Sequence, residues 1–233
     1  MKFIAVLFLF ALAATSYATV SRSRVILVDT AGQNLMFRTN SPANTTAGTY
    51  DLELLFSYMR DEAVKNGVEF PEVFTVEAFT FLNQLEPEHR DPEIAYFQAH
   101  PEYKLFSKII VGDLVNPNKY NAAIRKVMAK TYHKWNLDQL DILTTKMHDT
   151  LVAQGDIPKV IFFHCVAGED RTGEVFGAYK MLFNGWTYRQ ALDFDNQVET
   201  RKIKDMSRNG LNWFCYFMQE TNGYKGNDCE YLG

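Results

Sequence analysis

Residues 160–173 constrain this chain more than any other part of its sequence. They read Val-Ile-Phe-Phe-His-Cys-Val-Ala-Gly-Glu-Asp-Arg-Thr-Gly. The apolar run at 159–163 contains β-branched and aromatic residues and predicts a buried strand. Beyond the run, apolar side chains recur at helical spacing, at Val175, Ala178, Tyr179 and Leu182. The pattern predicts a strand, a tight loop and a helix, with Cys165 at the start of the loop and Arg171 at its end.

Such a loop is suited to binding a phosphate monoester. Backbone N–H groups that precede a helix turn inward, and the helix dipole adds positive potential, so the loop can cradle a dianion. The same field favours the thiolate of Cys165 and is expected to lower its pKa below the free value of about 8.5. Arg171 offers two parallel donors to two phosphate oxygens, which a lysine does not. The residues expected to surround the phosphate are Val166, Ala167, Gly168, Glu169, Asp170, Arg171 and Thr172.

The motif His-Cys-x-x-Gly-x-x-Arg-Thr-Gly, which begins at His164, resembles the signature of the cysteine-dependent protein tyrosine and dual-specificity phosphatases. The resemblance covers residues 159–200 and, more loosely, the helical stretch before them. It implies an α/β fold with a small central, mostly parallel sheet flanked by many helices. It also implies hydrolysis through a phosphocysteine on Cys165. No metal or other cofactor is expected, because the loop itself supplies the positive field.

The resemblance further implies a general acid, usually an aspartate on a mobile loop upstream of the cysteine and just ahead of a helix. Asp138, in the segment Trp-Asn-Leu-Asp-Gln-Leu-Asp, is the nearest fit to that spacing. An aspartate at the start of a helix also acts as a cap, so a structural role for Asp138 is open as well. The other candidates for the acid are Asp141, His133, Asp113 and Asp170.

Glu169 and Asp170 bear on the substrate. The Asp-Arg-Thr at 170–172 resembles that of myotubularin-like lipid phosphatases, but Glu169 stands where some of those relatives carry a phosphate-binding lysine. A loop carboxylate in an acidic chain disfavours a polyanionic substrate. The sequence therefore predicts a phosphotyrosine or dual-specificity phosphatase that acts on a phosphorylated protein or small phosphate ester. A phosphoinositide or inositol phosphate phosphatase is the alternative enzyme, and a catalytically silent phosphate-binding pseudophosphatase is the alternative of another class.

The N-terminus predicts export. An apolar run at 3–14 follows Lys2 and precedes Ser-Tyr-Ala, with small residues at the positions that signal peptidase recognises. We predict a signal peptide over residues 1–18, cleaved after Ala18, and one phosphatase-like catalytic domain over residues 19–233. The run is shorter than the roughly 20 apolar residues that a membrane anchor needs, so stable membrane insertion is not expected.

The mature chain is expected to be secreted or to lie in an endomembrane lumen. Asn44, in the sequence Asn-Thr-Thr, is an acceptor for N-glycosylation on that route. The chain has 3 cysteines, and in an oxidising compartment Cys215 and Cys229 are expected to pair, which leaves Cys165 as a free thiol. Zinc binding is the alternative for these cysteines, but the sequence has no Cys-x-x-Cys motif to support it.

Composition fits one globular monomer. The formal net charge of −4 becomes −5 when Lys2 is removed, and the chain has no run of lysine or arginine, so nucleic acid is not an expected partner. The residue patterns predict short strands at 25–29 and 106–111. They also predict helices at 51–66 (with Asp51 as its cap), 75–85, 92–106 (interrupted near Pro101), 118–132, 140–153, 187–198 (with Thr187 and Gln190 as a capping box) and 210–221.

Overall fold

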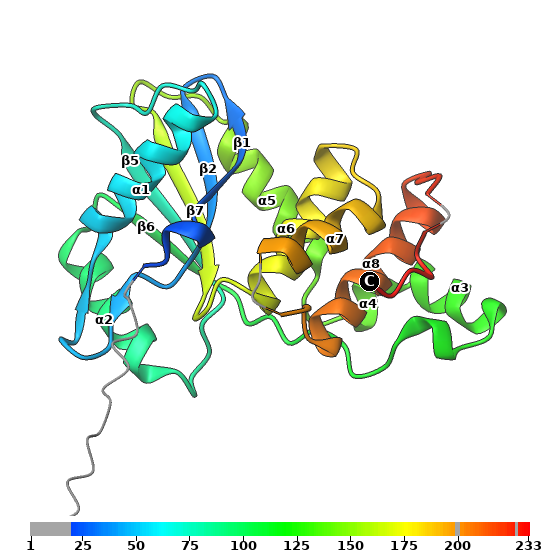
Figure 1. The fold of residues 1–233 in the computed structure, drawn as a ribbon. Coiled ribbons are helices and arrows are strands. Elements are labelled where there is room, and N and C mark those ends of the chain that lie inside the picture. Colours follow the sequence, from blue (N-terminus) through cyan, green and yellow to red (C-terminus); the bar gives the residue numbers. More distant parts are fainter. Residues whose placement is uncertain (1–19, 199–200, 227) are drawn as a thin grey trace, which may run out of the picture.

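The computed structural model describes residues 20–198, 201–226 and 228–233. At its centre is a five-stranded sheet with strand order β1-β2-β7-β5-β6 (Figure 1). The strands are β1 Ile26–Ala31, β2 Asn34–Asn40, β5 Thr75–Thr80, β6 Lys104–Ser107 and β7 Lys159–Cys165. β1 pairs antiparallel with β2, whereas β2, β7, β5 and β6 run parallel. The predicted α/β fold with a small, mostly parallel sheet is confirmed.

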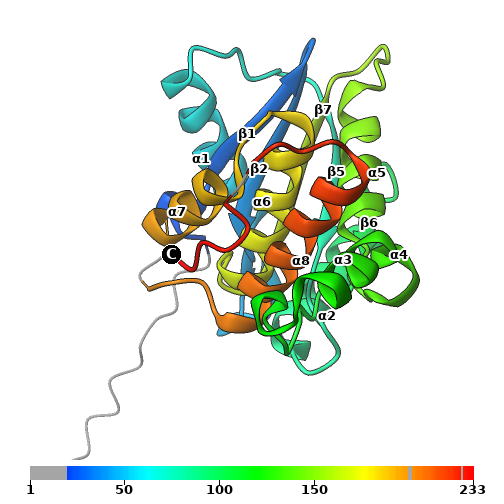
Figure 2. The same ribbon diagram turned by 90° about the vertical axis from the view of Figure 1, so that its right-hand side faces the viewer.

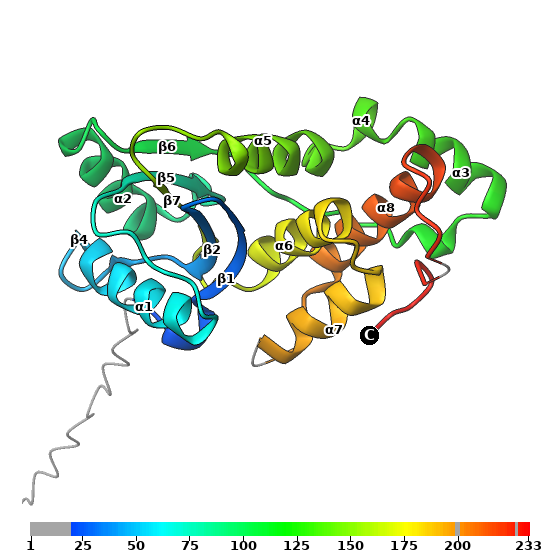
Figure 3. The ribbon, with the colours of Figure 1, turned by 90° about the horizontal axis from the view of Figure 1, so that it is seen from above.

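Helices cover both faces of this sheet. They are α1 Leu52–Lys65, α2 Pro87–Ala99, α3 Ala122–Lys130, α4 Tyr132–Trp135, α5 Leu140–Val152, α6 Asp170–Phe183, α7 Tyr188–Val198 and α8 Asp205–Thr221. Seen from above, α1 and α2 lie on one face and α5 and α6 on the other (Figure 3). A view onto the second face shows α6 between α7 and α8 (Figure 2). A two-stranded hairpin, β3 Ala43–Asn44 and β4 Thr49–Tyr50, follows β2.

The central strand β7 divides the interior into two hydrophobic cores. Its side chains alternate, so Val160 and Phe162 pack in the core that includes α1. Ile161 and Phe163 pack in the core that includes α5, α6 and α8. Because both faces of the strand are buried, its sequence is continuously apolar, as is typical of an internal parallel strand. Its carboxyl end, at His164 and Cys165, aligns with the ends of β2 and β5.

Several predicted elements are confirmed and others are wrong. Helix α1 begins after Asp51, whose carboxylate accepts from the N–H of Leu54 at 3.0 Å, and Thr187 and Gln190 form the predicted capping box of α7. The predicted helix over 75–85 is instead strand β5, buried between β7 and β6. Residues on both faces of β5 are buried, so the strand lacks a regular apolar–polar alternation, and such short runs resemble helices in sequence.

Two further differences concern strand boundaries. The predicted helix over 92–106 begins earlier and ends at Ala99, and 104–107 forms the edge strand β6 in place of the strand predicted at 106–111. Strand β2 was not predicted, because it carries the polar residues Asn34, Arg38, Thr39 and Asn40. All four are buried in the structure. Burying polar side chains is unfavourable, so the sequence pattern argues against a buried strand here. Their hydrogen bonds compensate this cost.

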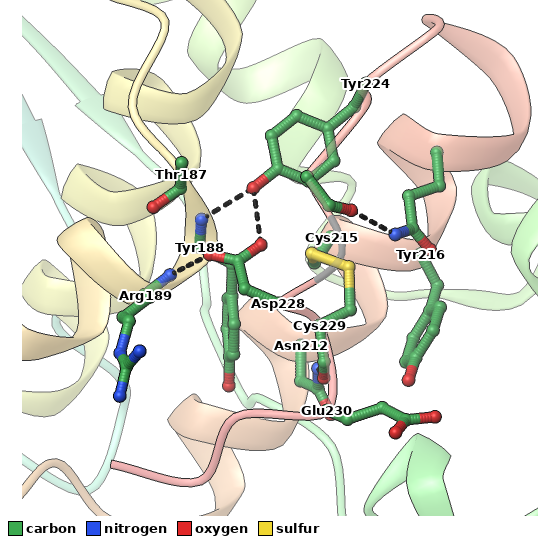
Figure 4. Close-up of a disulfide and its surroundings, with 12 residues drawn as sticks. Thr187, Tyr188, Arg189, Asn212, Cys215, Tyr216, Tyr224, Asp228, Cys229 and Glu230 are labelled. Atoms are coloured by element: carbon green, nitrogen blue, oxygen red, sulfur yellow. Dashed lines mark hydrogen bonds between the residues drawn. A yellow bond between two sulfur atoms is a disulfide. The ribbon is translucent and has the colours of Figure 1, made fainter.

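The predicted disulfide between Cys215 and Cys229 is present and ties the C-terminal segment to α8 (Figure 4). The hydroxyl of Tyr224 accepts a hydrogen bond from the N–H of Tyr188 at 2.8 Å and donates one to Asp228 at 2.7 Å. These bonds tie the same segment to the start of α7. Both cysteines are buried, and Cys165 is a free thiol, as predicted.

The predicted signal peptide, with its cleavage after Ala18, lies outside the described residues. Within the described part of the chain, no helix has the length and apolar character needed to cross a membrane. The predicted glycosylation acceptor, Asn44, lies in β3, and its side chain accepts from the N–H of Ala47 at 3.0 Å.

Candidate active site

The loop at 165–170 lies where the sequence predicts it, between the carboxyl end of β7 and the start of α6. Cys165 is 3% exposed and sits at the bottom of the loop. The hydroxyl of Thr172 accepts from the N–H of Cys165 at 2.9 Å and donates to its sulfur at 3.2 Å. Thr172 thus contacts the Cys165 sulfur directly, and a hydrogen bond of this kind is suited to stabilising a thiolate.

The peptide groups of the loop are oriented by hydrogen bonds on its outer side. The carbonyl of Val166 accepts from the N–H of Ser41 at 3.0 Å, and the carbonyl of Gly168 accepts from Nη2 of Arg38 at 2.9 Å. In a trans peptide the N–H points away from the carbonyl. The N–H groups of Ala167 and Glu169 are therefore directed to the inner side of the loop.

These inner N–H groups have no competing partner in the described part of the protein. Among the residues that the structure describes, none accepts a hydrogen bond from the backbone N–H of residues 166–169. Buried or half-buried N–H groups are nearly always paired in proteins, so a row of unpaired ones is an anion-binding arrangement. The start of α6 adds the positive end of its dipole to the same place.

Two glycines fit the loop into its surroundings. Gly168 has a φ of +67°, and a Cβ there would lie 2.6 Å from the carbonyl oxygen of Thr39 and 2.8 Å from the N of Asn40. A Cβ at Gly173 would lie 3.0 Å from the carboxylate of Asp195. Glycine is needed at 168 for its backbone conformation and at both positions for close packing.

The carboxylate of Asp195, on α7, forms a buried ion pair with Arg38, on β2. Both side chains are fully buried, and the Arg38 guanidinium also lies over the ring of Phe176 at 4.8 Å. The sequence did not indicate either residue as part of the site. Their sequence context does not single them out, because β2 and α7 each carry several polar residues and the two partners are far apart in the chain.

Arg171 is oriented by a second acidic residue that the sequence did not predict. Glu86, just before α2, accepts from Nη1 at 2.9 Å and from Nη2 at 2.5 Å, and the carbonyl of Phe81 also accepts from Nη1 at 2.6 Å. Burial alone would lower the pKa of Arg171, but Glu86 and the negative charge of Cys165 raise it. Burial would raise the pKa of Glu86, but the hydrogen bonds and charge of Arg171 lower it.

The contacts of Arg171 with Glu86 and Phe81 leave one edge of its guanidinium available among the described residues. An arginine has five N–H donors. Glu86 accepts from one donor on Nη1 and one on Nη2, and the Phe81 carbonyl accepts from the other donor on Nη1. The Nε–H and the second Nη2–H remain, and they lie on the same edge. That edge matches two oxygens of one phosphate, as the sequence predicts for Arg171.

Glu169 and Asp170 are both paired with basic residues. Glu169 forms ion pairs with Arg24 at 2.5 Å and Arg201 at 2.9 Å, and Asp170 forms them with Arg201 at 2.7 Å and Lys204 at 3.5 Å. Burial would raise the pKa of Asp170, but Arg201 and the N–H of Lys204 lower it. The negative charge of Glu169, which the sequence analysis weighs against a polyanionic substrate, is thus balanced by Arg24 and Arg201. Both carboxylates point toward these basic residues, which surround the loop.

The candidate acid Asp138 is fully buried, ahead of α5. Its two oxygens accept from the N–H groups of Val111 and Gly112 at 2.8 and 2.7 Å, so it holds the segment that follows β6. Burial raises the pKa of Asp138, and these two N–H groups lower it again in part. Asp113 lies in the same segment and is only half-buried. One of its oxygens accepts from the N–H of Val115 at 2.9 Å, and burial raises its pKa.

The remaining candidates lie elsewhere. His133 is exposed on the short helix α4. Asp141 is in the first turn of α5, where it complements the helix dipole. Neither has a described hydrogen bond or ion pair to the loop at 165–171.

Comparison with known proteins gives a remote likeness in fold. No family model and no curated protein matches this sequence. The core catalytic domain of the PP-IP phosphatase SIW14 from S. cerevisiae is 14% identical, with a TM-score of 0.42 over 88% of this chain and 94% of that one. A kinase associated phosphatase whose catalytic cysteine is replaced by serine is 13% identical, with a TM-score of 0.43 over 85% and 95%. Human DUSP28 is 13% identical, with a TM-score of 0.39 over 83% and 95%.

Proposed function

We propose that this protein hydrolyses phosphate monoesters through a phosphocysteine on Cys165. The observation that carries the proposal is the loop itself. It combines a thiol that accepts from Thr172, inward N–H groups without acceptors in the described protein, and an arginine with a two-donor edge. Each of these features binds a tetrahedral dianion or stabilises a thiolate, and together they suit no uncharged ligand.

The reaction takes place in two steps. The Cys165 sulfur attacks phosphorus, the S–P bond forms, and the P–O bond to the leaving group breaks while a general acid protonates the departing oxygen. Water then attacks phosphorus and the S–P bond breaks, with the same carboxylate taking the proton from water. Arg171 and the loop N–H groups hold the phosphoryl oxygens through both steps.

Asp113 is the general acid in this proposal, and Asp138 is the residue that positions it. An acid must reach the leaving oxygen, and Asp113 is partly exposed whereas Asp138 is enclosed with both oxygens engaged. The raised pKa of Asp113 keeps a larger share of it protonated, as the first step requires. Asp113 also lies beside α8, since its N–H donates to the carbonyl of Met206 at 2.9 Å. The backbone N–H of Lys204, two residues before Met206, donates a hydrogen bond to the carboxylate of Asp170 in the loop.

The substrate class proposed is a protein phosphotyrosine or another ester with an apolar leaving group. Loops that follow β5 and β6, the strands next to β7, carry large exposed apolar residues: Leu85 is 90% exposed and Leu114 is 81% exposed. They provide apolar surface on the edge of the sheet where the loop lies. Glu169 and Asp170 already neutralise the basic residues around the loop. Few cations are therefore available for a second phosphate.

The compartment proposed is a secretory one, because the N-terminal sequence has the pattern of a signal peptide. The Cys215–Cys229 disulfide is typical of proteins that fold in such a compartment.

A substrate panel on the purified protein tests the function. We expect turnover of an aryl phosphate and of phosphotyrosine peptides, and loss of this turnover in Cys165→Ser with vanadate binding retained. If the wild-type protein binds vanadate but hydrolyses no phosphate ester, it is a phosphate-binding module and not an enzyme. If it hydrolyses inositol polyphosphates in preference, the chemistry stands and the substrate class is wrong.

A further inference from the structure

Glu174 is a buried carboxyl group that the proposed mechanism does not use. It lies in α6, shortly after Arg171, and its side chain is fully buried. Neither of its oxygens accepts a hydrogen bond from a described residue. A Cβ added at Gly210 of α8 would collide with Oε1 of Glu174 and would lie 3.2 Å from the Cα of Gly112. The carboxyl group is therefore enclosed by α8 and by the segment that carries Asp113.

Asp138 is the second carboxyl group in this enclosure. The two groups lie close enough for a hydrogen bond once one of them carries a proton. Both oxygens of Asp138 already accept, from the N–H groups of Val111 and Gly112 at 2.8 and 2.7 Å. No basic residue in the described part of the chain forms an ion pair with either carboxyl group. Lys108, whose charge lowers the pKa of Asp138, donates instead to the carbonyl of Leu137 at 3.0 Å.

Two ionised carboxylates are not stable in such a site, because both are buried and each repels the other. Asp138 is the ionised member, since each of its oxygens accepts from an N–H group. Glu174, whose oxygens accept none, is the member with a proton to donate. In agreement, burial and then the charge of Asp138 raise the pKa of Glu174 well above its ordinary value. Burial raises the pKa of Asp138 as well, but the two N–H groups and Glu174 lower it.

We propose that Glu174 is a positioning residue, whose protonated carboxyl group donates to Asp138 and keeps Asp138 as the double acceptor that holds the segment of Asp113. The inference rests on the proposed function only in taking Asp113 as the general acid. Without this donor the buried Asp138 would take up a proton itself, and its protonated oxygen would no longer accept from an N–H group. The segment would then lose one of the two bonds that tie it to Asp138.

Asp113 depends on these bonds because it directly follows Gly112. Its own peptide groups are held by α8: the N–H of Asp113 donates to the carbonyl of Met206 at 2.9 Å, and its carbonyl accepts from Nδ2 of Asn209 at 3.0 Å. A shift of Gly112 away from Asp138 therefore changes the direction in which the chain enters Asp113, and with it the position of the acid.

The groups that face the pair from neighbouring elements bring no positive charge. Asp113 is half-buried, and burial raises its pKa. Tyr132 of α4 is fully buried, and burial raises its pKa well above the ordinary value, so it stays neutral. Asp141 of α5 adds a negative charge near Tyr132, and Ser207 of α8 is uncharged. The proton of Glu174 is thus what stabilises the buried charge beside it.

Carbon NMR of the wild-type protein with labelled glutamate tests the proton directly. Exposed glutamates have an ordinary pKa of about 4.3 and are ionised at about pH 7, whereas the carboxyl group of Glu174 is expected to be protonated there. Comparison with Glu174→Gln assigns its signal. An ionised Glu174 at this pH would overturn the proposal, and the measurement requires no phosphatase activity.

Hydrogen exchange at the N–H of Gly112 tests the effect on the acid segment. Glu174→Met removes the donor at a similar side-chain length, and we expect exchange at Gly112 to become faster by about tenfold or more. Glu174→Gln keeps a donor in its amide group and should retain slow exchange. The N–H of Phe81, which donates to the carbonyl of His164 at 2.8 Å, is the reference within each sample and should not change.

Two further variants show whether Glu174 acts through Asp138. Tyr132→Phe is the matched control, since it removes a buried hydroxyl of the same cluster that has no described partner, and Gly112 should exchange there at the wild-type rate. In an Asp138→Asn background, Glu174→Met should not accelerate the exchange further. An acceleration of the same size in that background, or wild-type exchange in Glu174→Met alone, would contradict the proposal. Far-ultraviolet circular dichroism checks that each variant is folded.

Kinetics separate this inference from the proposed function. Glu174→Met should lower kcat for aryl phosphates by about tenfold and leave the affinity for vanadate unchanged, because the loop that binds the oxyanion is intact. Glu174→Gln should retain the wild-type kcat. Faster exchange at Gly112 with an unchanged kcat would show that Glu174 orders the segment without positioning the acid, and would overturn the proposal.

The two failures are distinguishable. If the exchange at Gly112 responds as expected but the wild-type protein turns over no phosphate ester, the hydrogen bond from Glu174 to Asp138 stands and the proposed function fails. If the wild-type protein is active and Glu174→Met resembles it in both exchange and kcat, the function stands and the inference fails.

Discussion

Arg38 in β2 donates a hydrogen bond of 2.9 Å to the carbonyl of Gly168 in the loop, and its other end is held by the carboxylate of Asp195 in α7. Three segments far apart in the sequence thus meet at one fully buried guanidinium. The bond fixes the peptide that follows Gly168 and turns the N–H of Glu169 inward. The anion-binding shape of the loop therefore depends on residues outside the loop.

Replacing Arg38 should weaken phosphate binding and stability together. Arg38→Lys keeps a positive charge but cannot serve Asp195 and Gly168 at once, since a lysine has no planar fork. We expect the free energy of unfolding to fall by about 3 kcal/mol, as for other disrupted buried pairs, and the affinity for vanadate to fall about tenfold. Arg22→Lys is the control, because its pair with Asp61 is exposed, and a change below about 0.5 kcal/mol is expected there. Denaturant unfolding and vanadate titration measure both effects, and unchanged vanadate affinity in Arg38→Lys would contradict the role given to the Gly168 carbonyl.

The assignment of the acid predicts a dependence on the leaving group. Asp113→Asn should lower kcat by about 100-fold for phenyl phosphate, whose leaving group needs a proton, and by much less for p-nitrophenyl phosphate. The pKa of Asp113 is raised by burial, so the high-pH limb of wild-type activity should lie above the ordinary aspartate value of about 3.9. This limb should disappear in Asp113→Asn.

Asp138→Asn serves as the matched comparison for Asp113. If Asp138 positions the segment after β6, its replacement should lower stability and affect both esters alike. If instead Asp138→Asn abolishes the high-pH limb and Asp113→Asn does not, Asp138 is the acid, as its spacing from Cys165 predicts.

Glu174 in α6 predicts a pH dependence of stability. It is fully buried, neither of its oxygens has a described hydrogen-bond partner, and it lies against Gly210 of α8. Burial and then the charge of Asp138 raise its pKa well above the ordinary value. A carboxyl with a raised pKa in the folded state costs no stability below its unfolded pKa of about 4.3. The cost grows as pH rises toward the folded pKa and is complete above it.

Glu174→Gln should therefore stabilise the protein at high pH and have little effect at low pH. The amide has a similar shape and carries no charge, so we expect a gain of about 1 kcal/mol at high pH, or about 2–4 °C in Tm. Thermal unfolding from about pH 4 to pH 8 measures it. A gain of the same size at every pH would show that ionisation of Glu174 is not its cause.

The ion pairs of Glu169 predict how substrate preference can be changed. Glu169→Gln removes the carboxylate that pairs with Arg24, so this cation becomes available to an additional phosphate, whereas Arg201 keeps its ion pair with Asp170. The wild-type enzyme should prefer phosphotyrosine peptides, and the substitution should move kcat/KM toward an inositol polyphosphate by about tenfold, or 1.4 kcal/mol. Added salt should reduce this change. Glu72→Gln, an exposed site, is the control, and a Glu169→Gln variant with the wild-type ratio would contradict the proposed charge balance.

Sequence and structure agree where the determinants are local. Cys165, Thr172 and Arg171 lie within one strand–loop–helix unit, so their spacing predicts their geometry. Asp51 and the Thr187–Gln190 box act within one helical turn and were predicted for the same reason.

The supporting residues could not be predicted, because their partners are distant in the chain. Glu86 meets Arg171, Glu93 meets His164, and Arg38 meets Asp195 only after the parallel strands have aligned. Strand β5 was predicted as a helix because burial on both faces removes the alternation that marks a strand.

The phosphoenzyme itself gives the most direct test of the central claim. The protein is mixed with excess aryl phosphate, quenched rapidly in acid and digested, and the modified residue is located by mass spectrometry. We expect a phosphoryl group on the peptide that contains Cys165, formed before steady-state product release, and no such peptide from Cys165→Ser. A phosphoryl group on another residue, or undiminished turnover by Cys165→Ser, would contradict a phosphocysteine mechanism.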